Sequence, residues 1–273
     1  MDSVLLDDTS TSTASIDEDR NIRQMPAPSL TATQSVSVII PALNEEASIG
    51  NLLLRLDHAL TQAGIPYEAL IVDDHSTDNT LAIVEALART HQLPARALRK
   101  QGLPGKAFSL MEGFAQAQGD VLAMIDGDLQ YPPEVLPEMV SHLAHADIVV
   151  ADRRKSYSQV DHLRGALSHV FTDMIVSMLF GLDTDMQSGL KVFHRRVYAG
   201  VQAPGRWSFD LHLVTQAVSR GAVVANVPIA FYERQGGKSK VAPLAVGVEL
   251  LVTALRLKMH LKTRPVSSKS GKN

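Results

Sequence analysis

The 273-residue chain contains no cysteine. It therefore has no disulfide, no thiolate metal ligand and no cysteine nucleophile, and it fits a reducing compartment. It also lacks the roughly 18 uninterrupted apolar residues expected of a membrane-spanning helix. The nearest candidate, residues 241–257, is interrupted by Glu249 and Arg256. Its first residues are acidic and contain no apolar core, so no secretory signal is expected.

Two common nucleotide-binding signatures are missing as well. No Gly-x-Gly-x-x-Gly fingerprint and no Walker-type phosphate loop follows any predicted strand. Residues 102–106, Gly-Leu-Pro-Gly-Lys, resemble the Walker loop only superficially, because they lack its spacing and its Ser/Thr. The histidines are not clustered at metal-ligand spacing either. These absences argue against a nicotinamide-dependent enzyme, an ATPase and a histidine-based metal site.

Charge is distributed unevenly although the formal net charge is only −3. Acidic residues gather at the start of the chain: Asp2, Asp7, Asp8, Asp17, Glu18 and Asp19. Basic residues gather at its end: Arg256, Lys258, Lys262, Arg264, Lys269 and Lys272. The basic end is typical of a segment that meets an anionic surface, and equally of a solvated tail. No nucleic-acid partner is expected.

The chain divides into three parts by composition. Residues 1–34 are rich in Ser, Thr and Asp without a sustained period, which indicates a flexible leader. Residues 35–240 are expected to form one globular domain, and the whole chain, with 45% hydrophobic and 20% charged residues, has the composition of a globular protein. Residues 241–273 combine apolar positions with basic neighbours and predict an amphipathic interfacial helix followed by a basic tail.

Short apolar runs alternate with helical patterns throughout the middle part. Strands are predicted at residues 36–40, 69–72, 95–98, 121–125 and 148–150. Helices are predicted between them, at about residues 49–63, 80–89, 106–118 and 133–145, and a later one ends at Arg220. Strands that alternate with helices of this length predict an α/β fold with a mainly parallel sheet covered on both faces.

Polar residues follow three of these strands directly: Asn44 and Glu45, Asp73 and Asp74, and Asp126 and Asp128. In an open α/β sheet, ligands bind beyond the carboxyl ends of the strands. The three loops are therefore expected to converge on one rim of the sheet.

The most informative segment is residues 124–134, Met-Ile-Asp-Gly-Asp-Leu-Gln-Tyr-Pro-Pro-Glu. A calcium loop is excluded because no bidentate Glu closes it, and the two prolines disfavour a hairpin. What remains is an acid-Gly-acid turn at a strand end, with Gln130 expected on the same side as Asp128 at the period of an extended chain. Magnesium and manganese prefer such oxygen ligands together with substrate phosphates, although a purely structural turn is the alternative.

Several motifs together resemble one enzyme family. They are residues 41–46 (Pro-Ala-Leu-Asn-Glu-Glu), 72–80 (Val-Asp-Asp-His-Ser-Thr-Asp-Asn-Thr), 126–134, 188–190 (Ser-Gly-Leu) and 234–240. They resemble the GT-A glycosyltransferases of sequence family two, in the polyprenol-phosphate branch. That branch includes dolichol-phosphate mannosyltransferases and undecaprenyl-phosphate sugar transferases. The resemblance covers about residues 36–240 and implies a GT-A, Rossmann-like fold.

The resemblance also implies roles for individual residues. Those that resemble the donor site are Pro41, Leu43, Glu45, Val72, Asp74, Asp126, Gly127, Asp128, Arg234 and Lys240. Asp128 and Gln130 resemble the direct ligands of Mg2+ or Mn2+, and Asp126, Asp128 and Arg234 the catalytic set. Arg153, Arg164 and Ser168 match the positions that hold a lipid phosphate, for which arginine presents a planar fork. The chain departs from the family at Leu43, where Tyr is frequent, at Leu190 and at Lys238.

The expected reaction is inverting transfer of a hexose from a GDP- or UDP-sugar to a dolichyl or undecaprenyl phosphate. Because a lipid phosphate is already ionised, orientation and stabilisation of the leaving diphosphate are expected to suffice. If a general base acts, Asp126 and Asp185 are the candidates, with a structural role favoured for Asp185. The protein is expected peripherally at the cytoplasmic face of a membrane, with a separate membrane-protein partner as one option.

Two other functions stay open. One is a family-two transferase that acts on a non-phosphorylated lipid or glycan hydroxyl, and the other is a non-catalytic nucleotide-sugar binding module. The combination of Asp126, Asp128, Gln130, Arg234 and Lys240 argues against the binding module, because a site without turnover has no need for every charge opposite a diphosphate.

Overall fold

The computed structural model describes residues 34–154, 156, 179–201, 205, 208–232 and 243–260. Its strands are β1 Val36–Ala42, β2 Tyr67–Asp73, β3 Ala95–Arg99, β4 Val121–Met124, β5 Ile148–Asp152, β6 Lys191–His194 and β7 Val224–Pro228. Its helices are α1 Ile49–Gln62, α2 Thr80–Thr90, α3 Lys106–Gln116, α4 Leu136–His142, α6 Arg195–Tyr198, α7 Phe209–Ser219 and α8 Pro243–His260, with a 3-10 turn η2 at Pro133–Val135.

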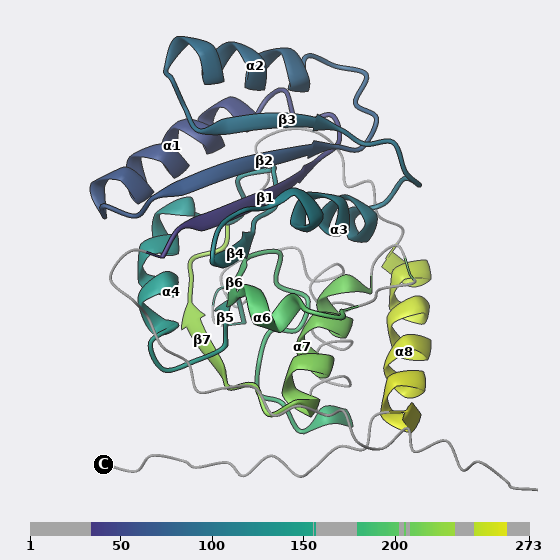
Figure 1. The fold of residues 1–273 in the computed structure, drawn as a ribbon. Coiled ribbons are helices and arrows are strands. Elements are labelled where there is room, and N and C mark those ends of the chain that lie inside the picture. Colours follow the sequence, from purple (N-terminus) through teal and green to yellow (C-terminus); the bar gives the residue numbers. More distant parts are fainter. Residues whose placement is uncertain are drawn as a thin grey trace, which may run out of the picture.

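The seven strands form one sheet in the order β3-β2-β1-β4-β6-β5-β7 (Figure 1). The pairs β2–β3, β1–β2, β1–β4 and β5–β7 are parallel, whereas β6 runs antiparallel to both β4 and β5. The predicted α/β fold with a mainly parallel sheet is therefore confirmed. The sequence did not predict β6 and β7, because β6 carries Lys191 and His194 and β7 is only half-buried.

Helices cover both faces of the sheet (Figure 1). Alternate residues of each strand point to opposite faces, so Val38 and Ile40 of β1 pack with α1 and α4, while Ile39 packs with α3 and α7. A third apolar cluster joins α7 to α8 through Leu211, Val214, Leu250 and Ala254. Within the described residues, no helix is long and apolar enough to cross a membrane.

One predicted helix begins differently from expectation. The pattern at residues 133–145 predicts a continuous helix, but the structure has the η2 turn followed by α4. Pro137 lies in the first turn of α4, where its missing N–H costs no helical hydrogen bond; further inside a helix it would break one. The α-helix can therefore begin only just before this proline.

Candidate active site

Three loops meet at the carboxyl edge of the neighbouring parallel strands β2, β1 and β4, as the sequence predicts. The backbone N–H of Asp74 donates to the carbonyl of Ala42 at 2.7 Å, joining the loops after β1 and β2. The hydroxyl of Ser48 donates to the carbonyl of Gly127 at 2.8 Å, joining the β1 loop to the loop after β4. These bonds hold the motifs at residues 41–46, 72–80 and 126–134 on one rim.

The loop after β4 is a tight turn. Leu129 has φ +60°, a left-handed conformation uncommon outside glycine, and the N–H of Gln130 donates to Oδ1 of Asp128 at 3.2 Å. The expected extended spacing of Asp128 and Gln130 is therefore wrong, although the turn still keeps the two residues together. Such strain is concentrated at functional sites. We call residues 126–130 the metal loop.

Both predicted metal ligands have defined surroundings. The Asp128 residue is only 5% exposed, and the amide nitrogen of Gln130 donates to the carbonyl of Tyr232 at 3.3 Å. Because the nitrogen of the amide is used in this bond, its oxygen is the atom that could bind a cation. In the described part of the chain, no three His, Cys, Asp or Glu side chains form a metal cluster by themselves. A two-ligand protein site that shares its cation with phosphates fits this arrangement, and it is how magnesium is usually held.

Asp126 lies between a lysine and a glycine. Its Oδ1 is 2.5 Å from Nζ of Lys106, the first residue of α3. Its carboxylate lies so close to Gly189 that a Cβ added there would be 2.0 Å from Oδ2. Burial and the nearby carboxylates of Asp128 and Asp210 raise the pKa of Asp126 against the opposing effect of Lys106. Burial would lower the pKa of Lys106, but attraction to Asp126 and Asp210 outweighs this and raises it.

Asp74, expected at the nucleoside, is fixed by the segment before α3. Its Oδ1 accepts from Nζ of Lys100 at 2.7 Å and its Oδ2 from the N–H of Gly105 at 2.8 Å. The Lys100 side chain is 0% exposed and donates also to the Gly105 carbonyl and the Ser109 hydroxyl. The position of Asp74 therefore depends on a buried lysine that sequence reasoning did not single out.

The other residues expected at the donor differ in their burial and in their distance from the metal loop. Glu45 lies beside Gly127, since a Cβ on Gly127 would be 3.5 Å from Cγ of Glu45 and 3.5 Å from the carbonyl oxygen of Pro41. Leu43 is partly exposed in the same loop. The side chain of Val72 is fully buried in the cluster with α3, so only its backbone can face a ligand, and its place at the donor stays a prediction.

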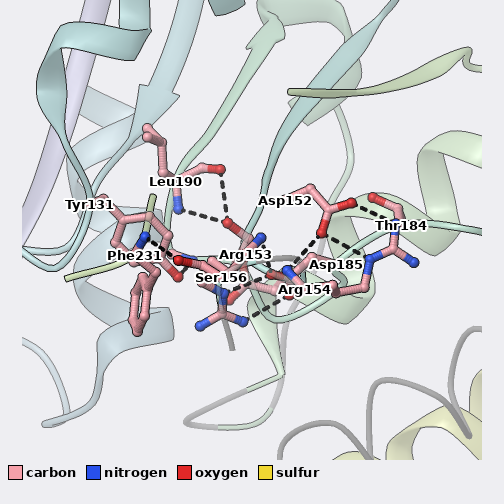
Figure 2. A network of polar contacts seen from close by, with 12 residues as sticks. Tyr131, Asp152, Arg153, Arg154, Ser156, Thr184, Asp185, Leu190 and Phe231 are labelled. Atoms are coloured by element: carbon pink, nitrogen blue, oxygen red, sulfur yellow. Dashed lines mark hydrogen bonds and ion pairs between the residues drawn. The ribbon is translucent and has the colours of Figure 1, made fainter. Parts of the chain in front are cut away.

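Of the residues expected to hold the acceptor phosphate, only Arg153 lies among the described residues. Arg153 follows β5, and its guanidinium forms a two-bond ion pair with Asp185 (Figure 2). Because Asp185 is 0% exposed and both its oxygens bind Arg153, it is not placed to accept a proton from an acceptor. Arg164, Ser168, Arg234 and Lys240 lie outside the described residues.

Two further charged residues, Lys191 and Asp210, lie under the rim. Lys191 of β6 is fully buried and donates to the carboxylate of Asp210 and the carbonyl of Ser188. The charge of Asp210, in the first turn of α7, contributes to raising the pKa of both Asp126 and Lys106. Lys191 was not predicted as a site residue, because a lysine directly after Ser-Gly-Leu is too common a signal to identify one.

The model of the family described as "Glycosyl transferase family 2" matches residues 37–201. A dolichol-phosphate mannosyltransferase of Pyrococcus furiosus is 29% identical over 211 residues, covering 75% of this chain and 58% of the relative. An undecaprenyl-phosphate 4-deoxy-4-formamido-L-arabinose transferase of Proteus mirabilis is 31% identical over 206 residues, covering 75% of this chain and 62% of the relative. The chain thus spans about 60% of the length of these curated relatives.

Solved structures share the fold at lower identity. Glucosyl-3-phosphoglycerate synthase of Mycobacterium tuberculosis, in complex with Mn2+, UDP-glucose and phosphoglyceric acid, has a TM-score of 0.63 at 18% identity, covering 83% of this chain and 80% of that one. Mannosyl-3-phosphoglycerate synthase of Rubrobacter xylanophilus has a TM-score of 0.64 at 17% identity, covering 87% and 78%.

The family model covers more than half of the chain, including β1, β2, β4 and the metal loop between β4 and η2. The rim on which Asp74, Asp126 and Asp128 meet therefore lies inside the matched region. The chain belongs to glycosyl transferase family 2.

Proposed function

We propose that the chain transfers a hexose, with inversion, from a nucleotide-diphosphate sugar to a polyprenyl phosphate at a membrane surface. One observation carries the proposal: the metal loop lies on the same rim as the loops after β1 and β2, linked to them by hydrogen bonds. The names of the relatives, which include a dolichol-phosphate and an undecaprenyl-phosphate transferase, support the acceptor class.

The donor's diphosphate is assigned to the metal loop. Asp128 and Gln130 would hold Mg2+ or Mn2+, which supplies positive charge that stabilises a departing diphosphate. Lys106 is the nearest described cation to this loop, being in contact with Asp126. The nucleoside is assigned to the loops that carry Leu43, Glu45 and Asp74, where the contact with Lys100 orients the Asp74 carboxylate.

We assign Arg234 and Lys240 to the donor phosphates because the residues just before them, Phe231 and Tyr232, are bonded close to the metal loop. The N–H of Tyr232 donates to the carbonyl of Gln130 at 3.0 Å, and the N–H of Phe231 donates to the hydroxyl of Ser156 at 3.0 Å. The chain therefore departs from the metal loop only two residues before Arg234. This anchoring supports a role for both basic residues at the donor phosphates.

The chemistry asks the protein for positioning more than for proton transfer. A phosphate monoester is ionised at neutral pH, so its oxygen can attack the anomeric carbon without a general base while the bond to the diphosphate breaks on the opposite side. Arginine and lysine side chains stabilise the charge that develops on the leaving group. Arg153, whose guanidinium lies 5.7 Å from the ring centre of Tyr131, is our candidate for the acceptor phosphate.

The outer face of α8 supports contact with an anionic membrane. Large apolar residues are exposed at helical spacing along it: Val248, Leu251, Val252, Leu255 and Met259. At about 100° per residue, exposed Arg256 and Lys258 fall on the two borders of this stripe. A second copy docked on the stripe would bring these like charges together, whereas anionic headgroups would attract them.

Turnover tests the function directly. With Mn2+, a polyprenyl phosphate and a panel of GDP- and UDP-hexoses, we expect a sugar-phosphate lipid to form from one donor, and the same donor to give the largest thermal shift. Asp128→Asn should abolish transfer, while Asp120→Asn, at the opposite end of β4, should not. Transfer to the unphosphorylated polyprenol instead would refute the proposed acceptor, and donor binding without turnover would refute catalysis.

Flotation with vesicles tests the membrane contact. We expect the protein to float with phosphatidylglycerol-containing vesicles and less with phosphatidylcholine alone. The double variant Leu255→Glu/Met259→Glu should stay in the dense fraction. Leu54→Glu, which adds a charge at an exposed leucine of α1, should float like the wild type. Loss of a dimer in the α8 variant, with flotation unchanged, would instead assign the stripe to a second copy. The side of the membrane and a membrane-protein partner stay predictions.

A further inference from the structure

Arg153 is held more tightly than an arginine at the edge of a binding site needs to be. Its Nε donates to Oδ2 of Asp185 at 2.7 Å and its Nη2 to Oδ1 at 2.8 Å, and its own backbone N–H donates to Oδ2 at 3.2 Å. The guanidinium side chain is 9% exposed and the Asp185 side chain 0%. Figure 2 shows the pair at the centre of a polar network that joins the end of β5 to the segment before β6.

Two aromatic rings fix the same guanidinium from other directions. Its Cζ lies 5.2 Å from the ring centre of Phe231 and 5.7 Å from that of Tyr131. The two rings meet edge to face, with centres 5.1 Å apart. Tyr131 comes directly after the metal loop and Phe231 after β7, so three separate segments of the chain determine where Arg153 lies.

Tyr131 also connects this arrangement to the donor side. Its buried hydroxyl accepts a hydrogen bond from the N–H of Gly189 at 2.6 Å. Gly189 in turn lies against the carboxylate of Asp126. Tyr131 therefore contacts both the Arg153 guanidinium and the glycine that lies against Asp126.

The neighbouring cations favour the ionised form of Asp185. Burial would raise its pKa, but Arg153 and, to a smaller degree, Lys191 outweigh burial and lower it. A buried ion pair adds little net stability compared with apolar packing, because both charges lose their hydration. The geometry therefore needs an explanation other than stability, and orientation of Arg153 provides one.

We propose that Asp185 is a positioning residue for the acceptor: by occupying the Nε–Nη2 edge of Arg153, it holds the guanidinium ready for one phosphate group. Without that carboxylate only the two aromatic rings would hold the guanidinium, so its orientation would have to be set at each binding event, which weakens binding. The inference rests on the proposed function, since it assumes that the acceptor carries a phosphate.

The neighbouring pair offers a matched control. Arg154 binds Asp152 through Nε and Nη2, at 2.9 and 2.6 Å, and reaches Asp183 through Nη1 at 2.5 Å. The Asp183 side chain is 92% exposed. Asp183→Asn removes one carboxylate from the same segment and the same kind of contact, but outside the buried arrangement around Arg153.

The experiment compares Asp185→Asn, Asp185→Glu and Asp183→Asn with the wild type in full titrations of both substrates. For Asp185→Asn we expect the KM for polyprenyl phosphate to rise about tenfold or more while the KM for the nucleotide sugar changes less than about twofold. Asp185→Glu should recover part of the loss, and Asp183→Asn should behave as the wild type. A role in folding alone would reduce the amount of active enzyme and lower apparent kcat, with both KM values unchanged.

If Asp185→Asn does not fold, Arg153→Lys replaces it, because lysine keeps the charge but cannot form the two-bond fork; the same rise in acceptor KM is expected. An unchanged acceptor KM in the folded variant, or an equal rise in both KM values, overturns the positioning role while leaving the proposed function intact. A wild-type enzyme that transfers no sugar to polyprenyl phosphate overturns the proposed function, and the inference with it.

Discussion

Gly189→Ala is expected to disable the site although it adds a single methyl group far along the chain from the metal loop. A Cβ at this position would lie 2.0 Å from Oδ2 and 2.5 Å from Cγ of Asp126, and 2.9 Å from Cε2 of Tyr131. Non-bonded carbon atoms are normally about 3.5–4.0 Å apart, so at least one neighbour must move by about 1 Å or more. Tyr131 is packed in the core, which leaves Asp126 as the group that yields.

Gly189→Ala is expected to lower both the free energy of unfolding and the catalytic rate, by different amounts. Overpacking of this kind usually destabilises by about 1–3 kcal/mol, or roughly 2–10 °C in Tm for a chain of this size. Displacing a carboxylate of the site by about 1 Å can lower kcat about 100-fold. Activity should therefore fall much further than stability, and Asp126 should lose its contact with Lys106.

Gly127→Ala is the matched comparison. It lies within the metal loop itself, yet a Cβ there would meet its nearest neighbours at 3.5 Å, an ordinary contact. Parallel thermal melts and initial rates at saturating donor should show Gly189→Ala to be the more damaging of the two. Activity within about threefold of wild type for Gly189→Ala would refute the steric argument, because the displacement it requires corresponds to a far larger loss.

Lys100→Met leaves the carboxylate of Asp74 without its buried partner and should destabilise by about 3 kcal/mol, measured by urea unfolding; a loss below about 1 kcal/mol would contradict the importance of this pair. Because the pKa of Asp185 is lowered in the folded state, its stabilisation is complete above the unfolded value of about 4 and is lost as the pH falls through the lower folded value. Asp185→Asn should therefore flatten the dependence of unfolding free energy on pH below about pH 4, and an unchanged acid limb would count against the ion pair. A strong chelator should reduce turnover about 100-fold or more, with recovery on adding Mn2+ or Mg2+, and full activity without divalent cations would remove the metal loop from the mechanism.

The sequence predicted most strands and helices correctly where the residue pattern of a segment matches its burial in the folded protein. The first strands are short β-branched or apolar runs, and α1 is followed two residues after Gln62 by Gly64, whose φ of +66° is that of a helix-terminating glycine. Prediction failed where a strand carries a buried charge: β6 begins with Lys191, whose ammonium group is buried only because Asp210 and the Ser188 carbonyl surround it. No local pattern distinguishes such a lysine from an exposed one.

The sequence by itself determined the α/β alternation, the acidic residues at three strand ends and the acid-Gly-acid turn, because each depends on neighbours within a few positions along the chain. Only the tertiary structure decided which partners those residues have. Lys100 meets Asp74, Lys106 meets Asp126, and Asp185 meets Arg153 across separations of 26, 20 and 32 residues. Such pairings form when strand order and helix packing bring distant segments together, and the energy of a charge in a crevice depends on those distances rather than on its position in the chain.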